Sequence, residues 1–104
     1  MPGQYRVRLS ADVLRDLEGI HAYIAKDSIS AASKMIQTLL DAIDSLEVLP
    51  HRAVVERQSA KLKYPVRSLA VPPYVIYFRV IDDEQIVQVR HIRHGARKPP
   101  KRLD

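Results

Sequence analysis

The residues whose types could do chemistry gather in the last third of the chain. Its densest basic region contains Arg90, Arg93, Arg97, Lys98, Lys101 and Arg102. Cations of this kind bind phosphate groups or acidic protein surfaces, provided that the fold lines them along one groove or face. The alternative is a solvated tail, which suits Lys101 and Arg102 best. Arg93 and Arg97 lie on or near a predicted strand, so they are the better candidates for a functional contact.

His91 and His94 suggest acid–base chemistry or a metal site. Residues three apart on a strand point to opposite faces, so these two histidines cannot share a metal ion. A structural or surface role is the alternative for both, and His94 could also act as a lone acid or base. The acidic run Asp82-Asp83-Glu84 is better explained as a solvated turn than as a calcium site. We therefore expect neither a metal nor a cofactor.

The positive charge is unevenly distributed along the 104 residues. The chain has a net charge of +5, with −2 on residues 1–51 and +7 on residues 52–104. This asymmetry favours an acidic or polyanionic partner for the second half, although a merely basic surface would look the same. The sequence contains no Cys, no apolar run resembling a signal peptide and no stretch long enough for a membrane span. A cytoplasmic location is the resulting expectation.

Hydrophobic periodicity predicts one α+β domain over residues 1–97, followed by a basic tail over 98–104. Strands are expected at residues 4–9, 66–71, 74–81 and 86–94, and helices at 11–26 and 29–49. Ser10 is placed to cap the first helix, and Pro50 cannot continue the second. Gly19 weakens the first helix, which suggests a close packing contact there. The order β-α-α-β-β-β predicts a helical hairpin on one face of a mainly antiparallel sheet whose other face stays partly open.

Several strings in this order resemble the RelE/ParE superfamily of toxins from type II toxin–antitoxin systems. They are Tyr5 to Ser10, Asp16-Leu17, Ile20 to Ile24, Asp27-Ser28, Leu46 to Pro50, Val66 to Leu69, Tyr74 to Val80 and His91 to Arg97. Each string is weak alone, but their order and spacing cover almost the whole chain. The string Leu69-Ala70-Val71-Pro72-Pro73-Tyr74 is most similar to the ParE branch, from which its two prolines depart.

The resemblance implies a toxin that inhibits DNA gyrase by stabilising its cleaved complex with DNA. It also implies a ParD-like antitoxin, a ribbon–helix–helix protein that neutralises the toxin by forming a hetero-oligomer with it. In that complex only the antitoxin would bind operator DNA. A RelE-like toxin, which cuts messenger RNA on the ribosome without a metal, is the main alternative. A non-toxic binding module of the same fold is a further alternative.

The RelE-like alternative would need cations and a proton-transfer group around the scissile phosphate. Arg67, Arg97 and the pair Lys61 and Lys63 could supply the cations. However, Val75 stands where RelE-type toxins carry an arginine, and no tyrosine occurs after Tyr77 to match their late tyrosine. We therefore expect no catalytic residues.

The resemblance also suggests which residues contact partners. For the toxic target we expect contacts from Arg93, His94, Arg97 and Lys98. An acidic, amphipathic antitoxin segment would cover apolar and basic surface on the first strand and the helical hairpin. The candidates for that contact are Arg6, Arg8, Tyr23 and Met35.

Overall fold

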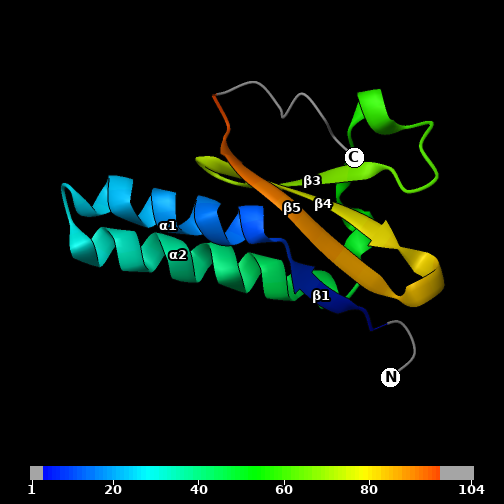
Figure 1. Cartoon of the computed structure of the whole chain (residues 1–104), viewed down its shortest axis with the longest axis horizontal. Helices are drawn as coiled ribbons and strands as arrows, with labels where there is room; N and C mark the ends of the chain where they lie inside the picture. Colours follow the sequence, from blue (N-terminus) through cyan, green and yellow to red (C-terminus); the bar gives the residue numbers. More distant parts are fainter. Residues whose placement is uncertain (1–3, 97–104) are drawn as a thin grey trace.

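The computed structural model describes residues 4–96, in which two helices cover one face of a five-stranded sheet (Figure 1). The main elements are β1 (Arg6–Leu9), α1 (Ala11–Ala25), α2 (Ile29–Asp44), β2 (Val54–Val55), β3 (Val66–Val71), β4 (Tyr74–Ile81) and β5 (Ile86–His94). Short 3-10 turns η1 to η4 cover Ser45–Glu47, Pro50–Arg52, Arg57–Ser59 and Asp82–Glu84. The predicted α+β architecture is confirmed. Arg97, Lys98 and the predicted tail lie outside the described residues.

The strands are ordered β1-β5-β4-β3-β2 across the sheet. β1 runs parallel to β5, whereas all other neighbouring pairs are antiparallel. β4 lies in the middle, as its apolar residues on both faces predict. β2 is an additional two-residue edge strand within residues 51–63, where the sequence predicts a loop or an irregular strand.

Serine side chains begin both helices. The Ser10 hydroxyl accepts a hydrogen bond from the Val13 N–H, and the Ser28 hydroxyl accepts one from the Ala31 N–H, each at 3.1 Å. Each bond satisfies one of the amide groups that the first turn of a helix leaves free. The two-residue break after Lys26 lets α2 return antiparallel beside α1, and the hairpin extends beyond the ends of the strands (Figure 1).

The prediction that the second helix reaches Leu49 is wrong, because α2 ends at Asp44. A 3-10 turn follows and brings Leu46 into the core, where it is fully buried. Leu49 then adopts a left-handed conformation with φ of 51° before Pro50. The Arg52 guanidinium donates hydrogen bonds to the carbonyls of Val48 and Leu49 at 2.9 and 3.1 Å, which supplies partners for groups that no helix satisfies. Packing of Leu46 and these bonds therefore decide where the helix stops.

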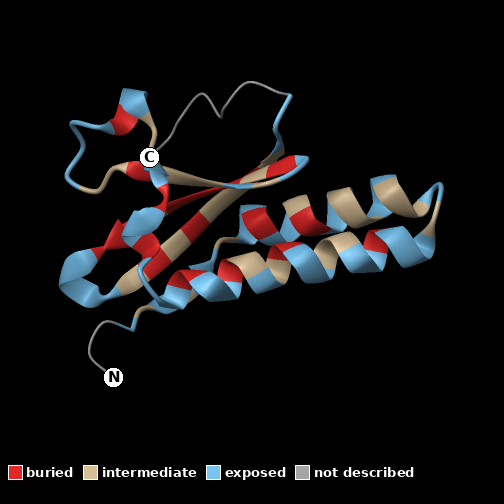
Figure 2. Ribbon diagram, turned by 180° about the vertical axis from the view of Figure 1, so that it is seen from behind, coloured by how far each residue is buried: buried red, intermediate tan, exposed pale blue. Residues whose placement is uncertain are grey.

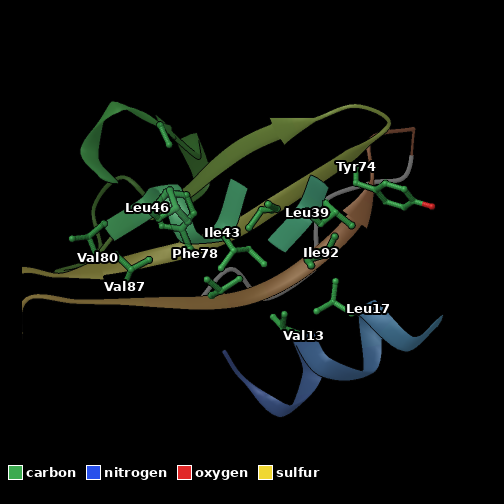
Figure 3. Close-up of a cluster of buried hydrophobic side chains, with 13 residues drawn as sticks. Val13, Leu17, Leu39, Ile43, Leu46, Tyr74, Phe78, Val80, Val87 and Ile92 are labelled. Atoms are coloured by element: carbon green, nitrogen blue, oxygen red, sulfur yellow. The ribbon is translucent and has the colours of Figure 1, made fainter. Parts of the chain in front are cut away.

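The core lies between the helices and the sheet. Val13 and Leu17 of α1 point toward the strands, and Phe78 on β4 is fully buried beneath the end of α2 (Figure 3). Buried residues alternate with exposed ones along α2 and in the first half of α1, as expected for helices with one face against a sheet (Figure 2).

Gly19 does not mark a close packing contact, contrary to the prediction. It is exposed on α1, and a Cβ atom built there meets nothing within 4 Å. We expect Gly19→Ala to raise the free energy of unfolding by up to about 1 kcal/mol, because alanine restricts the unfolded chain without steric cost. Thermal unfolding should show a midpoint about 4 °C higher. Ala22→Gly, on an exposed turn of the same helix, is the control and should lower it; equal midpoints for all three proteins would contradict the prediction.

Candidate functional site

The face of the sheet turned away from the helices, which we call the open face, collects cations. Side chains alternate along a strand, so the residues that neighbour core residues such as Ile76 and Phe78 on β4 point to the open face. The strand register extends this face to the other strands, where it holds Arg6, Arg8, Ser68, Ala70, Val75, Tyr77, Arg79, Gln88, His91 and Arg93. The same register places Val54, Val66, Ile81 and Ile86 on this face, and of these Val66 and Ile81 are buried. Arginines from both ends of the sequence thus share one surface.

One row crosses three strands of the open face. Arg8 on β1 and Arg79 on β4 both pair with Gln88 on β5, which lies between them. Arg79 Nη2 lies 3.5 Å from Gln88 Oε1, so this contact is long. The five described strands contain six arginines and no aspartate or glutamate. Their positive charge is therefore not balanced within the sheet.

Arg93, a predicted target contact, is held by the first helix. Its guanidinium Nη1 lies 3.1 Å from Asp16 Oδ1, and the other carboxylate oxygen accepts a 3.0 Å hydrogen bond from the Ile92 N–H. β1 pairs with β5 only as far as Val89, so α1 covers the rest of this strand edge. The Ser10 hydroxyl also donates to the Arg90 carbonyl at 3.2 Å. Asp16 both protects the edge and offsets part of the Arg93 charge.

His91 and His94 lie on opposite faces, as the spacing predicts. His91 pairs with Tyr77 on the open face, whereas the His94 ring packs edge-on against Tyr74 with 5.6 Å between centroids. His94 Nδ1 accepts a 3.1 Å hydrogen bond from the Ala96 N–H. Within residues 4–96 no group of three or more His, Cys, Asp or Glu residues could hold a metal ion.

Burial and the neighbouring charges of Arg93 and Arg90 lower the pKa of His91, with Asp16 and Asp12 partly offsetting them. A lowered pKa keeps the imidazole neutral. On the paired residue Tyr77, burial and the Glu56 carboxylate raise the phenol pKa, so this group stays protonated.

The lowered pKa of His91 predicts a pH-dependent stability. As the pH falls below about 6.5, His91 in the unfolded chain takes up a proton before His91 in the folded chain does. The free energy of unfolding should therefore fall with pH in this range. Urea unfolding at pH 7.5 and pH 5.5 should show a larger loss for the wild type than for His91→Gln. Equal losses in both proteins would contradict this assignment.

Three of the residues proposed for RNA cleavage, Arg67, Lys61 and Lys63, lie in the described part of the chain. Arg67 Nη1 donates hydrogen bonds to the backbone carbonyls of His51 and Ala53 at 3.1 and 3.0 Å, so it ties β3 to the preceding segment. Lys61 and Lys63 are exposed on the loop before β3. The fourth candidate, Arg97, lies outside the described residues.

The four candidates for the antitoxin contact do not form one patch. Arg6 and Arg8 lie on the open face of β1, whereas Tyr23 is exposed about 18 Å along α1 from its first residue. Met35 on α2 is half-buried against the core. A single partner could reach all four only by wrapping around the domain.

Two contributors to this site, Arg79 and Asp16, are not among the residues predicted from the sequence. Arg79 is the single charge within the apolar strand β4, which was the available signal for it. In the sequence Asp16 stands out only as part of the Asp16-Leu17 string of the family resemblance. Its contacts with Ile92 and Arg93 join residues 76 and 77 positions apart. No local pattern reports such a contact.

The sequence matches the model of one known protein family. The family model of the ParE toxin of the type II toxin–antitoxin system parDE matches residues 7–99. The chain belongs to the ParE toxin family. It is 30% identical over 86 residues to the Sinorhizobium fredii protein named "Putative toxin Y4kP", covering 83% of this chain and 86% of that protein.

Solved structures show the same fold as this ParE family member. The chromosomal ParDE toxin–antitoxin system from P. aeruginosa matches with a TM-score of 0.69 and 20% identity, covering 88% of this chain and 97% of that one. The archaeal RelE–RelB complex from Pyrococcus horikoshii matches with a TM-score of 0.66 and 14% identity, covering 91% and 99%. The ParE and RelE branches therefore share this architecture, and the fold alone does not distinguish them. Among the described residues, no helix is long and apolar enough to cross a membrane.

Proposed function

We propose that this ParE family toxin inhibits DNA gyrase in the cytoplasm by stabilising the cleaved gyrase–DNA complex, and that a ParD-like antitoxin neutralises it. The observation that carries the proposal is the match of residues 7–99 to the ParE toxin family. The basic open face agrees with a target that contains DNA.

The described residues also weaken the RelE-like alternative. Val75 offers no cation to a scissile phosphate, and Arg67 already donates to two backbone carbonyls. Tyr77 is 5% exposed and its raised pKa keeps the phenol protonated, so it is a poor base for activating a 2′-hydroxyl. Loss of a proton-transfer group typically lowers a rate by about 10²–10⁴.

The antitoxin partner is proposed to be a ribbon–helix–helix protein whose C-terminal segment wraps the toxin. The related structures come from toxin–antitoxin systems, which supports a hetero-oligomer of the same kind. The proposed contacts are Arg6, Arg8, Tyr23 and Met35, and the proposed target contacts are Arg93, His94, Arg97 and Lys98. The separation of the first four residues is compatible with a long segment that crosses from the sheet to the hairpin.

Purified toxin should block supercoiling by gyrase or accumulate cleaved plasmid in the presence of gyrase, and addition of the antitoxin should reverse either effect. Translation reactions containing ribosomes and messenger RNA are the parallel assay. Ribosome-dependent cuts without any effect on gyrase would replace the proposal by the RelE-like alternative. Full growth after induced expression of soluble toxin would instead favour a non-toxic binding module.

A further inference from the structure

The cations of the open face have few acidic partners. The Glu56 carboxylate reaches this face and accepts a 3.0 Å hydrogen bond from the Ser68 hydroxyl, but it pairs with none of the described strand arginines. Among residues 4–96, the only ion pair made by a strand arginine joins Arg93 to Asp16. Arg8 is exposed on β1. Within the described part of the chain, Arg79 makes only the long contact with Gln88, and its buried Nε has no hydrogen-bond partner. Unpaired arginines gathered on one surface favour an external anion, because each would otherwise repel its neighbours.

The spacing of these arginines suits an extended array of phosphates. Arg8 and Arg79 are separated by one intervening strand, which places their backbones about 10 Å apart. Two guanidinium groups carried on backbones this far apart can contact separate phosphates of one nucleic acid. The guanidinium group also presents several donors to phosphate oxygens at once.

The neighbouring surface is suited to the nucleic-acid backbone rather than to bases. Sheets that bind single strands stack bases on exposed aromatic side chains. The aromatic residue on the open face of β4 is Tyr77, which is 5% exposed, so it offers no stacking surface. Because base stacking is excluded, we expect this face to contact phosphates without regard to base sequence.

The proposed amphipathic antitoxin segment would share only the β1 edge of this surface, through Arg6 and Arg8, and it is a poorer match for the rest of the open face. Such a segment needs exposed apolar side chains beside the cations. The large exposed apolar residues on the helices are Leu14, Tyr23 and Ile29, whereas among the described open-face residues only Val54, on the β2 edge, is of this kind. Acidic peptides would therefore find charge on the open face but little apolar surface.

We propose that the open face binds the phosphate backbone of duplex DNA, with Arg8 and Arg79 on either side of Gln88 as its centre. The choice of duplex DNA rests on the proposed gyrase target, where the toxin would meet DNA held by the enzyme. The contact lies beyond the antitoxin-mediated binding of operator DNA, because it reads no sequence. His91, surrounded by Arg90 and Arg93, would lie beside the bound phosphates.

The test measures how tightly antitoxin-free toxin binds a fluorescein-labelled 30-base-pair duplex of arbitrary sequence. Fluorescence anisotropy gives the binding constant at KCl concentrations between 50 and 200 mM. The double variant Arg8→Gln/Arg79→Gln should bind about tenfold or more weakly, and the slope of log K against log salt should become shallower by about 1.8. Arg15→Gln is the matched control. Like each of the two substitutions in the double variant, it removes one positive charge. Arg15, however, lies on α1 and pairs with Asp12, so it is not part of the open face. Circular dichroism should confirm that all variants are folded.

A second readout does not depend on substitutions. The imidazole C–H resonances of His91 should shift when unlabelled duplex is added to the wild type, whereas those of His21 on α1 should not. Absence of salt-dependent binding, or an equal loss in Arg15→Gln, would overturn the proposal. Tighter binding of single-stranded RNA or of a polyglutamate peptide than of duplex DNA would also overturn it. The binding assay contains no gyrase, so its result is independent of the proposed target. If the toxin binds DNA but does not inhibit supercoiling by gyrase, only the proposed target is contradicted.

Discussion

Replacing Phe78 by alanine should lower the free energy of unfolding by about 3–5 kcal/mol, the largest effect expected from one substitution in this domain. Phe78 is fully buried on the central strand, in contact with residues from α2, η1 and the neighbouring strands. Truncation removes apolar contacts and leaves a cavity that a surrounded strand cannot close. A domain of this size has a total stability of about 5–15 kcal/mol, so the variant would be close to unfolding.

Urea unfolding measures this loss, and Val54→Ala provides the control. Val54 is also apolar and on a strand, but its 68% exposure predicts a change within about 0.5 kcal/mol. Growth arrest by Phe78→Ala should weaken through lower abundance of the folded toxin. A loss smaller than about 1 kcal/mol would show that the sheet and α2 do not pack around this ring.

The second large effect is expected at Asp16. Asp16→Ala should lower the free energy of unfolding by about 2 kcal/mol, because the Ile92 N–H loses its acceptor and Arg93 loses its ion-pair partner. Asp16→Asn retains an oxygen that can accept from the Ile92 N–H, so it should cost less. Chemical denaturation of both variants measures the difference.

Asp12→Ala is the control for Asp16, since within residues 4–96 the ion-pair partner of Asp12 is the exposed Arg15 on the same helix. Surface pairs of this kind contribute about 0–1 kcal/mol. Amide hydrogen exchange offers a direct check, because the Ile92 amide should exchange faster in Asp16→Ala than in Asp16→Asn. Equal exchange in the two variants would contradict the proposed role of the carboxylate at the edge of β5.

Most of the architecture could be predicted because its signals are local. Ser10 and Ser28 mark the starts of the helices, and apolar residues on both faces of β4 mark the central strand. The end of α2 could not be predicted in this way. Residues up to Leu49 continue an acceptable helical pattern, but burial of Leu46 and the hydrogen bonds of Arg52 stop the helix at Asp44.

The candidate site also combines features that the sequence predicts with features that only the structure shows. By itself the sequence determined which half of the chain is basic, that His91 and His94 lie on opposite faces of a strand, and that the chain resembles ParE toxins. Only the tertiary structure decided that Arg8 and Arg79 flank Gln88 and that Asp16 holds Arg93. Strand alternation is set within a few residues, whereas strand register and helix docking join residues about 70 or more positions apart through packing of the whole core.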